Sequence, residues 1–213
     1  MKKVVAINGS PRKNGNTAAL LQNILDGAKS QGAEVELINL VSLSYKGCTS
    51  CFACKRKGTE FVGKCAVKDE LTPVLEKAMA ADAVALGSPI YVGDVTGIMR
   101  SFIERFAFMN ISYSSKGSWH KVARKNGAFV YTMNVNNLQS KLFFYVYMMN
   151  TGILKKFGGY TAQLLATNTY QFDDYSRYDA LNFDEAKKRK CRETRFPKDR
   201  KKAYKIGQEL VTK

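Results

Sequence analysis

Short apolar runs alternate along this chain with longer stretches in which apolar residues recur every three or four positions. Residues 3–8 (Lys-Val-Val-Ala-Ile-Asn) form the first such run, and the first helical stretch follows at 16–31. This alternation is typical of a parallel sheet covered by helices on both faces. We predict strands near 3–8, 34–40, 82–87, 126–132 and 160–167, and helices near 16–31, 70–80, 96–108 and 137–155.

A last helical stretch is predicted from about residue 183 to residue 213, with a break at Pro197, because proline lacks the N–H group that continues a helix. Gly32 is expected to end the first helix, since glycine readily adopts the left-handed conformation found there. We expect one domain over residues 1–213, with 183–213 as a basic helical extension.

The first predicted strand leads into a polar loop that opens a helix. The loop reads Asn8-Gly9-Ser10-Pro11-Arg12-Lys13-Asn14-Gly15-Asn16-Thr17. Unpaired N–H groups and the helix dipole favour a phosphate at such a helix N-terminus. The loop lacks the lysine of G-x-x-x-x-G-K-S/T and the glycine spacing of G-x-G-x-x-G. We therefore expect a terminal monophosphate there; a solvated turn capped by Asn16 and Thr17 is the alternative.

A second loop follows the strand near 82–87 and reads Gly-Ser-Pro-Ile-Tyr-Val-Gly-Asp-Val-Thr-Gly over residues 87–97. Its Ile90–Tyr91 pair is suited to lie along a flat aromatic ligand, while backbone groups bond the edge of that ligand. The alternative for Tyr91 is an ordinary packed loop aromatic.

These residues together resemble the NADPH-dependent FMN reductase family of the flavodoxin-like superfamily. The resemblance rests on Asn8-Gly9-Ser10-Pro11-Arg12 with Asn16-Thr17, and on Gly87-Ser88-Pro89-Ile90-Tyr91 with Thr96-Gly97 and Glu104-Arg105. It covers roughly the first 110 residues, continues at 131–134 and weakens in the C-terminal third. It implies a doubly wound, five-stranded parallel α/β sheet of order 2-1-3-4-5, with its ligand at the carboxyl ends of the strands.

The resemblance also implies a role for each loop. The first would hold the FMN phosphate, and the second would contact the isoalloxazine ring together with the loop after the fourth strand. The phosphate candidates are Ser10, Arg12, Asn14, Asn16 and Thr17, and the ring candidates are Pro89, Ile90, Tyr91, Val92, Gly93 and Asn134. Asn136 and Asn137 could also donate to the ring, or could simply be turn residues. No side chain is expected to be a catalytic acid or base, because the flavin carries the chemistry.

A cysteine cluster follows the second predicted strand. Cys48, Cys51 and Cys54 form C-x2-C-x2-C, and Cys65 follows after ten residues. Thiols at this spacing indicate metal or redox chemistry. Iron–sulfur flavoproteins of the same superfamily carry a compact four-cysteine motif in this region. Here the gap before Cys65 is long, and the residue after it is Ala66 where ferredoxin-type motifs have proline.

Three outcomes for these cysteines stay open. They could bind a [4Fe–4S] cluster, form a redox thiol set whose pKa is lowered by the lysines and arginine of 55–57, or remain reduced and inert. Zinc is disfavoured, since the single histidine, His120, is distant in the sequence. Cys191 is interpreted as incidental.

The formal net charge of the 213-residue chain is +16, with a dense basic run over 187–205. Acidic residues are interleaved with that run, so it favours a solvated basic face over nucleic-acid binding. Attraction of NADPH or an acidic partner is a further alternative. No apolar run reaches the ~20 residues of a membrane span, and the N-terminal run is too short for a signal peptide. Reduced cysteines then point to the cytoplasm.

The expected function is an FMN-dependent NAD(P)H oxidoreductase that reduces flavin, a quinone or a similar small-molecule acceptor. An iron–sulfur flavoprotein, an FMN-binding electron carrier and a basic binding protein with a degenerate pocket are the alternatives. The aromatic stretch 142–149 predicts a buried helix that packs on the sheet and on a second subunit. This agrees with the homodimers or homotetramers that are usual in the family, with the flavin near the interface.

Overall fold

The computed structural model describes residues 1–114, 119–120 and 122–213. Five parallel strands form one sheet in the order β2-β1-β3-β5-β6. They are β1 (Lys3–Asn8), β2 (Glu34–Asn39), β3 (Ala83–Tyr91), β5 (Lys125–Thr132) and β6 (Gly158–Ala166). The predicted flavodoxin-like order of five parallel strands is confirmed. A two-residue strand β4 (Asp94–Val95), which was not predicted, pairs antiparallel with the end of β3.

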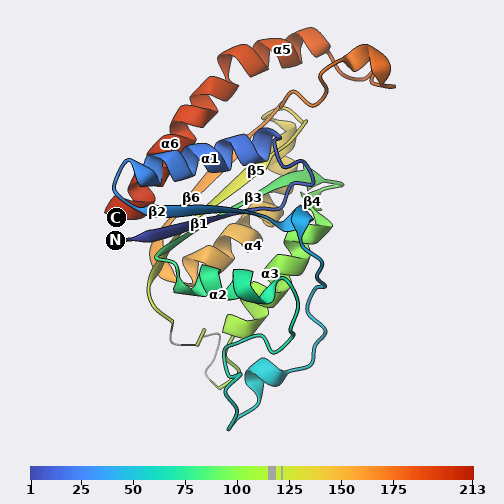
Figure 1. Ribbon diagram of the computed structural model, residues 1–213. Helices are drawn as coiled ribbons and strands as arrows, with labels where there is room; N and C mark the ends of the chain where they lie inside the picture. The colour runs from blue at the N-terminus through green and yellow to red at the C-terminus, as the bar shows by residue number, and fades with distance from the viewer. Residues whose placement is uncertain (115–118, 121) are drawn as a thin grey trace.

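Helices cover both faces of the sheet (Figure 1). Helices α1 (Asn16–Lys29) and α6 (Phe196–Thr212) lie on one face, and α2 (Thr72–Ala80), α3 (Gly97–Asn110) and α4 (Phe144–Lys155) on the other. Helices α1 and α6 pack closely because both carry glycine at the contact. A Cβ atom on Gly27 would lie 2.0 Å from the carbonyl oxygen of Tyr204, and one on Gly207 would lie 1.9 Å from that of Ile24.

Each strand divides its apolar side chains between two cores. The core beneath α1 and α6 takes small residues from the sheet, and the core beneath α2, α3 and α4 takes larger ones, in keeping with the period of two along a strand. The first core includes Val4, Ala6, Ala83, Ala85, Ala128 and Val130, and the second includes Val5, Ile7, Val84, Leu86, Phe129 and Tyr131.

The second predicted loop is a hairpin. Strand β3 continues to Tyr91, four residues beyond the predicted end, and turns back through Val92 and Gly93 into β4. Both turn residues have positive φ, 49° for Val92 and 90° for Gly93. The prediction that residues 88–91 lie in a loop was wrong, because strand pairing continues past the cluster of glycine, serine and proline.

The helix predicted at 137–155 begins as a 3-10 helix, Gln139–Phe143, and becomes α4 at Phe144. The composition of residues 142–149 predicted a buried helix, but within the single chain α4 is buried on one side only. One stripe packs on the sheet, and Phe144, Tyr145, Met148 and Met149 are exposed.

The C-terminal segment forms α5 (Glu185–Thr194) and α6, with the break at Arg195 rather than at Pro197. Pro197 lies in the first turn of α6, where a missing N–H group costs little. Helix α1 ends at Lys29, and Gly32 follows with φ of 78°, close to its predicted role. Among the residues that the structure describes, no helix is both long and apolar enough to cross a membrane.

Candidate functional site

The sheet order brings the predicted site loops together. Strands β1, β3 and β5 are neighbours, so their carboxyl ends meet at one edge. The Gly9 N–H group donates to the carbonyl of Gly87 at 2.8 Å, and the Thr96 hydroxyl donates to the carbonyl of Gly9 at 2.6 Å. The Thr17 and Thr132 hydroxyl oxygens lie 2.8 Å apart. The first loop, the β3–β4 hairpin and the end of β5 therefore form one continuous surface.

The N-terminus of α1 has the features of an anion site. Gly15 is the N-cap and provides no side-chain cap. Over the described ranges, the backbone N–H groups of Asn16, Thr17 and Ala18 have no hydrogen-bond partner. The Thr17 side chain is buried beside them, as is that of Ser10. Free N–H groups at a helix N-terminus favour a phosphate group there.

Two of the phosphate candidates are held by the segment that follows β6. Nη1 of Arg12 donates to the carbonyl of Gln171 at 2.5 Å, and Nδ2 of Asn16 donates to that of Tyr170 at 2.8 Å. Asn14 is exposed. The sequence analysis did not predict these two contacts. The feature that could have indicated them is the run of aromatic residues over 170–178, which favours packing of this segment on a neighbouring surface.

The ring candidates lie on the β3–β4 hairpin. Pro89, Ile90 and Tyr91 belong to β3, while Val92 and Gly93 form the turn. Tyr91 is about half exposed and Val92 fully so. An exposed aromatic side chain on a rigid hairpin is available for stacking on a flat ring.

Asn134 is held through its two oxygen atoms, and none of the hydrogen bonds in the described part of the chain involves its amide nitrogen. Its carbonyl oxygen lies 3.1 Å from Nζ of Lys188, and its Oδ1 atom accepts a further bond from the same ammonium. Lys188 also donates to Oδ1 of Asn168 at 3.2 Å and is 3% exposed. Burial lowers the pKa of Lys188. Within the part of the chain that the structure describes, no carboxylate forms an ion pair with it.

The other two asparagines of this segment differ: Oδ1 of Asn137 accepts from the Thr167 hydroxyl at 2.7 Å and from Arg195 at 2.6 Å, whereas Asn136 is a turn residue. Oδ1 of Asn136 accepts from the N–H groups of Leu138 and Gln139, which supports the alternative interpretation. The basic face is also not wholly solvated, since Lys188 and Arg192 of α5 reach the carboxyl edge of the sheet.

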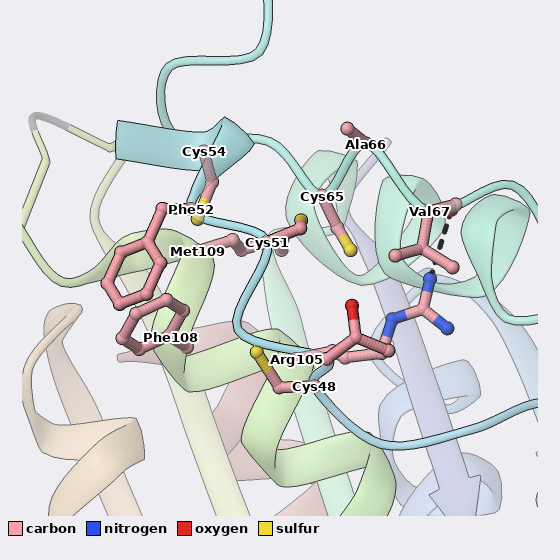
Figure 2. A pocket seen from close by; sticks show the side chains of 11 residues that line it. Cys48, Cys51, Phe52, Cys54, Cys65, Ala66, Val67, Arg105, Phe108 and Met109 are labelled. Carbon is pink, nitrogen blue, oxygen red and sulfur yellow. Dashed lines mark hydrogen bonds between the residues drawn. The ribbon is translucent and has the colours of Figure 1, made fainter. Parts of the chain in front are cut away.

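The four predicted metal candidates lie around one pocket, beside the α3 helix (Figure 2). Cys48, Cys51, Cys54 and Cys65 all line it, and all are free thiols. Its interior is about 20 Å³, room for about one water molecule. Among the described residues no three metal-ligating side chains are close enough to hold a single ion. Tetrahedral zinc would need sulfur atoms about 3.8 Å apart, as its ~2.3 Å Zn–S bonds require.

The predicted lowering of the Cys54 pKa by Lys55 is present but is outweighed by burial. Burial raises the pKa of its thiol, Lys55 opposes that effect, and the nearby Cys48 and Cys51 add to it. Nζ of Lys55 lies 2.5 Å from the carbonyl oxygen of Ile111, just beyond the C-terminus of α3, so its charge is partly engaged there.

Arg105 is a site residue whose role the sequence analysis missed. Its side chain is fully buried, and Nη1 pairs with Oδ2 of Asp69 at 2.5 Å. Nη2 donates to the carbonyl of Val67 at 3.2 Å, and in the described part of the chain Nε has no hydrogen-bond partner. Figure 2 shows Nε on the pocket side, toward the Cys65 sulfur. A cation on the apolar stripe of α3, between Phe102 and Phe106, was the available signal.

The chain is similar to known flavoproteins. Residues 2–148 match the family described as NADPH-dependent FMN reductase. An iron–sulfur flavoprotein of Archaeoglobus fulgidus is 44% identical over 103 residues, 48% of each chain. An iron–sulfur flavoprotein of Methanocaldococcus jannaschii is 34% identical over 111 residues, 52% of this chain and 55% of that one. The chain thus spans about half the length of the curated relatives it matches.

Solved structures share the fold along the whole chain. The NAD(P)H:quinone oxidoreductase from Methanothermobacter marburgensis superposes with a TM-score of 0.68 at 11% identity, over 98% of both chains. An azoreductase from Bacillus anthracis superposes with a TM-score of 0.65 at 15% identity, over 98% of this chain and 100% of that one. Since the matched family segment holds all three site loops and the cysteine pocket, the chain belongs to the NADPH-dependent FMN reductase family.

Proposed function

We propose that this protein is an FMN-dependent NAD(P)H oxidoreductase that reduces flavin, a quinone or a similar small acceptor. The observation that carries the proposal is the surface where three strand ends meet at the unpaired first turn of α1. Membership of the family supports the same cofactor.

The FMN phosphate would bind at the first turn of α1. The N–H groups of Asn16, Thr17 and Ala18 would donate to it, with the Ser10 and Thr17 hydroxyls beside them. Arg12 would add positive charge after exchanging its bond to Gln171 for one to the phosphate. These groups bind a dianion mainly through neutral donors, which suits a monophosphate.

The isoalloxazine ring would lie along the β3–β4 hairpin. Ile90 and Tyr91 would contact its face, and backbone groups of the hairpin would bond its edge. When bound, FMN accepts a hydride from the nicotinamide and passes the electrons to the acceptor. The chain therefore has to fix the ring and leave one face open, and no catalytic acid or base is needed.

Fluorescence titration of the apo-protein with FMN tests the cofactor, followed by steady-state oxidation of NADPH and of NADH with a quinone or free flavin. Tight FMN binding with turnover supports the proposal. FMN binding without turnover would indicate an electron carrier. A protein that takes up no FMN would contradict the proposal altogether.

A second candidate is an iron–sulfur flavoprotein with a [4Fe–4S] cluster on Cys48, Cys51, Cys54 and Cys65. Two observations favour it. Four free thiols line one pocket, and the buried Nε of Arg105 faces that pocket. Each cysteine of such a cluster binds a different iron, so the thiols lie further apart than around zinc. The free interior of the pocket has room for about one water molecule, so binding a cluster would require the pocket to open.

Iron and sulfide assays on protein purified without air test this candidate, together with the absorption spectrum. About four irons per chain with a broad visible absorption would support the cluster. A two-band flavin spectrum without iron would leave the four cysteines as thiols.

We also propose that the protein works in a reducing compartment such as the cytoplasm, as its free cysteines suggest. We further propose a homodimer or homotetramer, formed through the exposed apolar face of α4.

A further inference from the structure

The four-cysteine pocket collects negative charge whenever its thiols bind metal, because the ligand is the thiolate. Its lining contains little to balance that charge. Among the lining residues in the described part of the chain, Arg105 alone is a cation, and the others are cysteines or uncharged side chains. Its side chain has no exposed surface, so water does not screen it.

Three hydrogen bonds hold the outer nitrogens of Arg105. Nη1 donates to Asp69 and to the carbonyl of Lys46 at 3.4 Å, and Nη2 donates to the carbonyl of Val67. Nε has no partner among the described residues, although it is buried. A buried N–H group without a partner costs free energy, and such groups are rare in folded proteins. An ion pair with Asp69 would not by itself require the Nε–H group to be buried at the pocket without a partner.

We propose that Arg105 is a positioning residue of the four-cysteine pocket: its Nε–H group donates a hydrogen bond to sulfur inside the pocket, and its charge offsets the charge of the bound iron–sulfur group. This rests on the second candidate function. One-electron reduction adds negative charge to the pocket, and a fixed N–H donor stabilises that charge. Hydrogen bonds to cluster sulfur raise the reduction potential. Arg105 therefore sets the potential at which the pocket accepts an electron.

The test compares midpoint potentials of the anaerobically reconstituted protein in redox titrations, with iron, sulfide and thermal unfolding measured on each sample. Arg105→Lys keeps a cation and removes the Nε donor. The pair Asp69→Leu with Arg105→Met removes both charges together, so the summed charge is unchanged while the donor is lost; apolar replacement of a buried ion pair is often well tolerated. Asp69→Asn is the matched control, since it breaks the ion pair and leaves the guanidinium in place.

We expect the potential to fall in both Arg105 variants and not to fall in Asp69→Asn, where the guanidinium keeps its Nε donor and loses the opposing carboxylate. Loss of iron uptake in both Arg105 variants, with normal uptake in Asp69→Asn, would also support the inference. Wild-type iron content and potential in the Arg105 variants would overturn it, as would equal loss of iron in all three. A wild-type protein that binds no iron overturns the cluster proposal, and this inference with it. The two failures are therefore distinguishable.

Discussion

Oδ1 of Asn16, in the first turn of α1, accepts a hydrogen bond of 2.9 Å from Nη1 of Arg192 on α5, a residue 176 positions later in the chain. The amide nitrogen of Asn16 donates to the carbonyl of Tyr170 at 2.8 Å. The segment after β6 thus holds Asn16 from both ends of its amide. Since Asn16 lies where we propose the FMN phosphate binds, α5 is coupled to the cofactor site.

Replacing Arg192 with alanine is expected to weaken FMN binding about fivefold, or about 1 kcal/mol, because Asn16 loses the bond that fixes its orientation. Quenching of FMN fluorescence on titration with apo-protein measures the affinity. Lys190→Ala is the control, since it removes the same charge from an exposed position on the same helix. Equal losses in the two variants would indicate an effect of net charge alone and contradict the contact.

The buried hydroxyl pair of Thr17 and Thr132 gives a second prediction. Thr17→Val keeps the shape of the side chain and deletes its hydroxyl, so we expect FMN affinity to fall by about 1–2 kcal/mol. Thr132→Val breaks the same 2.8 Å contact from the side that does not face the phosphate. Thr132→Val should reduce the free energy of unfolding about as much as Thr17→Val does. Its loss of FMN affinity should be smaller than that of Thr17→Val. Unchanged FMN affinity in Thr17→Val would mean that the phosphate assignment is wrong.

Much of this fold could be predicted from the sequence because its signals are local. The run Val4-Val5-Ala6-Ile7 and the helical spacing that follows it decide the element type without reference to the rest of the chain. The sheet order then brings the strand ends, and with them Ser10, Thr17 and Tyr91, to one edge.

Contacts between distant segments could not be predicted in this way. Nothing near Arg192 indicates that it reaches Asn16, and nothing near Lys188 indicates that it reaches Asn134. The orientation of Arg105 into the cysteine pocket also depends on packing, and the sequence analysis did not assign it a role. The β3–β4 hairpin was missed because its turn places valine where glycine or asparagine is usual.

Val92 is the basis of a stability prediction. A β-branched residue with φ of 49° is strained, at a cost of roughly 1–2 kcal/mol. Val92→Asn should raise the free energy of unfolding by about 1 kcal/mol, measured by urea denaturation, because asparagine tolerates this conformation. Val92→Ala is the control, since alanine retains a Cβ atom and gains less. If asparagine stabilised the protein no more than alanine, the strain argument would fail.

Lys188 predicts a dependence of stability on pH. Burial lowers its pKa from the ordinary 10.5, so between the folded and unfolded pKa values the unfolded chain binds a proton that the folded chain does not. The free energy of unfolding then rises with pH in that window. Lys125 shifts in the same direction, so the comparison must be with Lys188→Met. The wild-type protein should gain stability relative to that variant as pH rises toward 10.5, in urea denaturation series.

The exposed Lys190 on the same helix provides the control for this measurement. Lys190→Met removes the same charge from an exposed position, and its urea series gives the baseline against which the Lys188→Met series is compared. If the difference between wild type and Lys188→Met followed that baseline, the charge of Lys188 would carry no burial penalty.

The apolar face of α4 predicts an assembly. Leu142, in the 3-10 helix that leads into α4, is 81% exposed, Phe144 is 67% exposed, and Met148 extends the patch. The β3–β4 turn lies beside this patch, since a Cβ atom on Gly93 would lie 4.0 Å from the ring of Phe143. A second copy on this face would therefore lie close to the proposed ring site.

Phe144→Glu should convert the oligomer to a monomer in light scattering and weaken FMN retention. Leu181→Glu, at a position 96% exposed outside the patch, should leave both unchanged. A wild-type protein that is monomeric at micromolar concentration would contradict the assembly, and the patch would then be open to the electron acceptor instead.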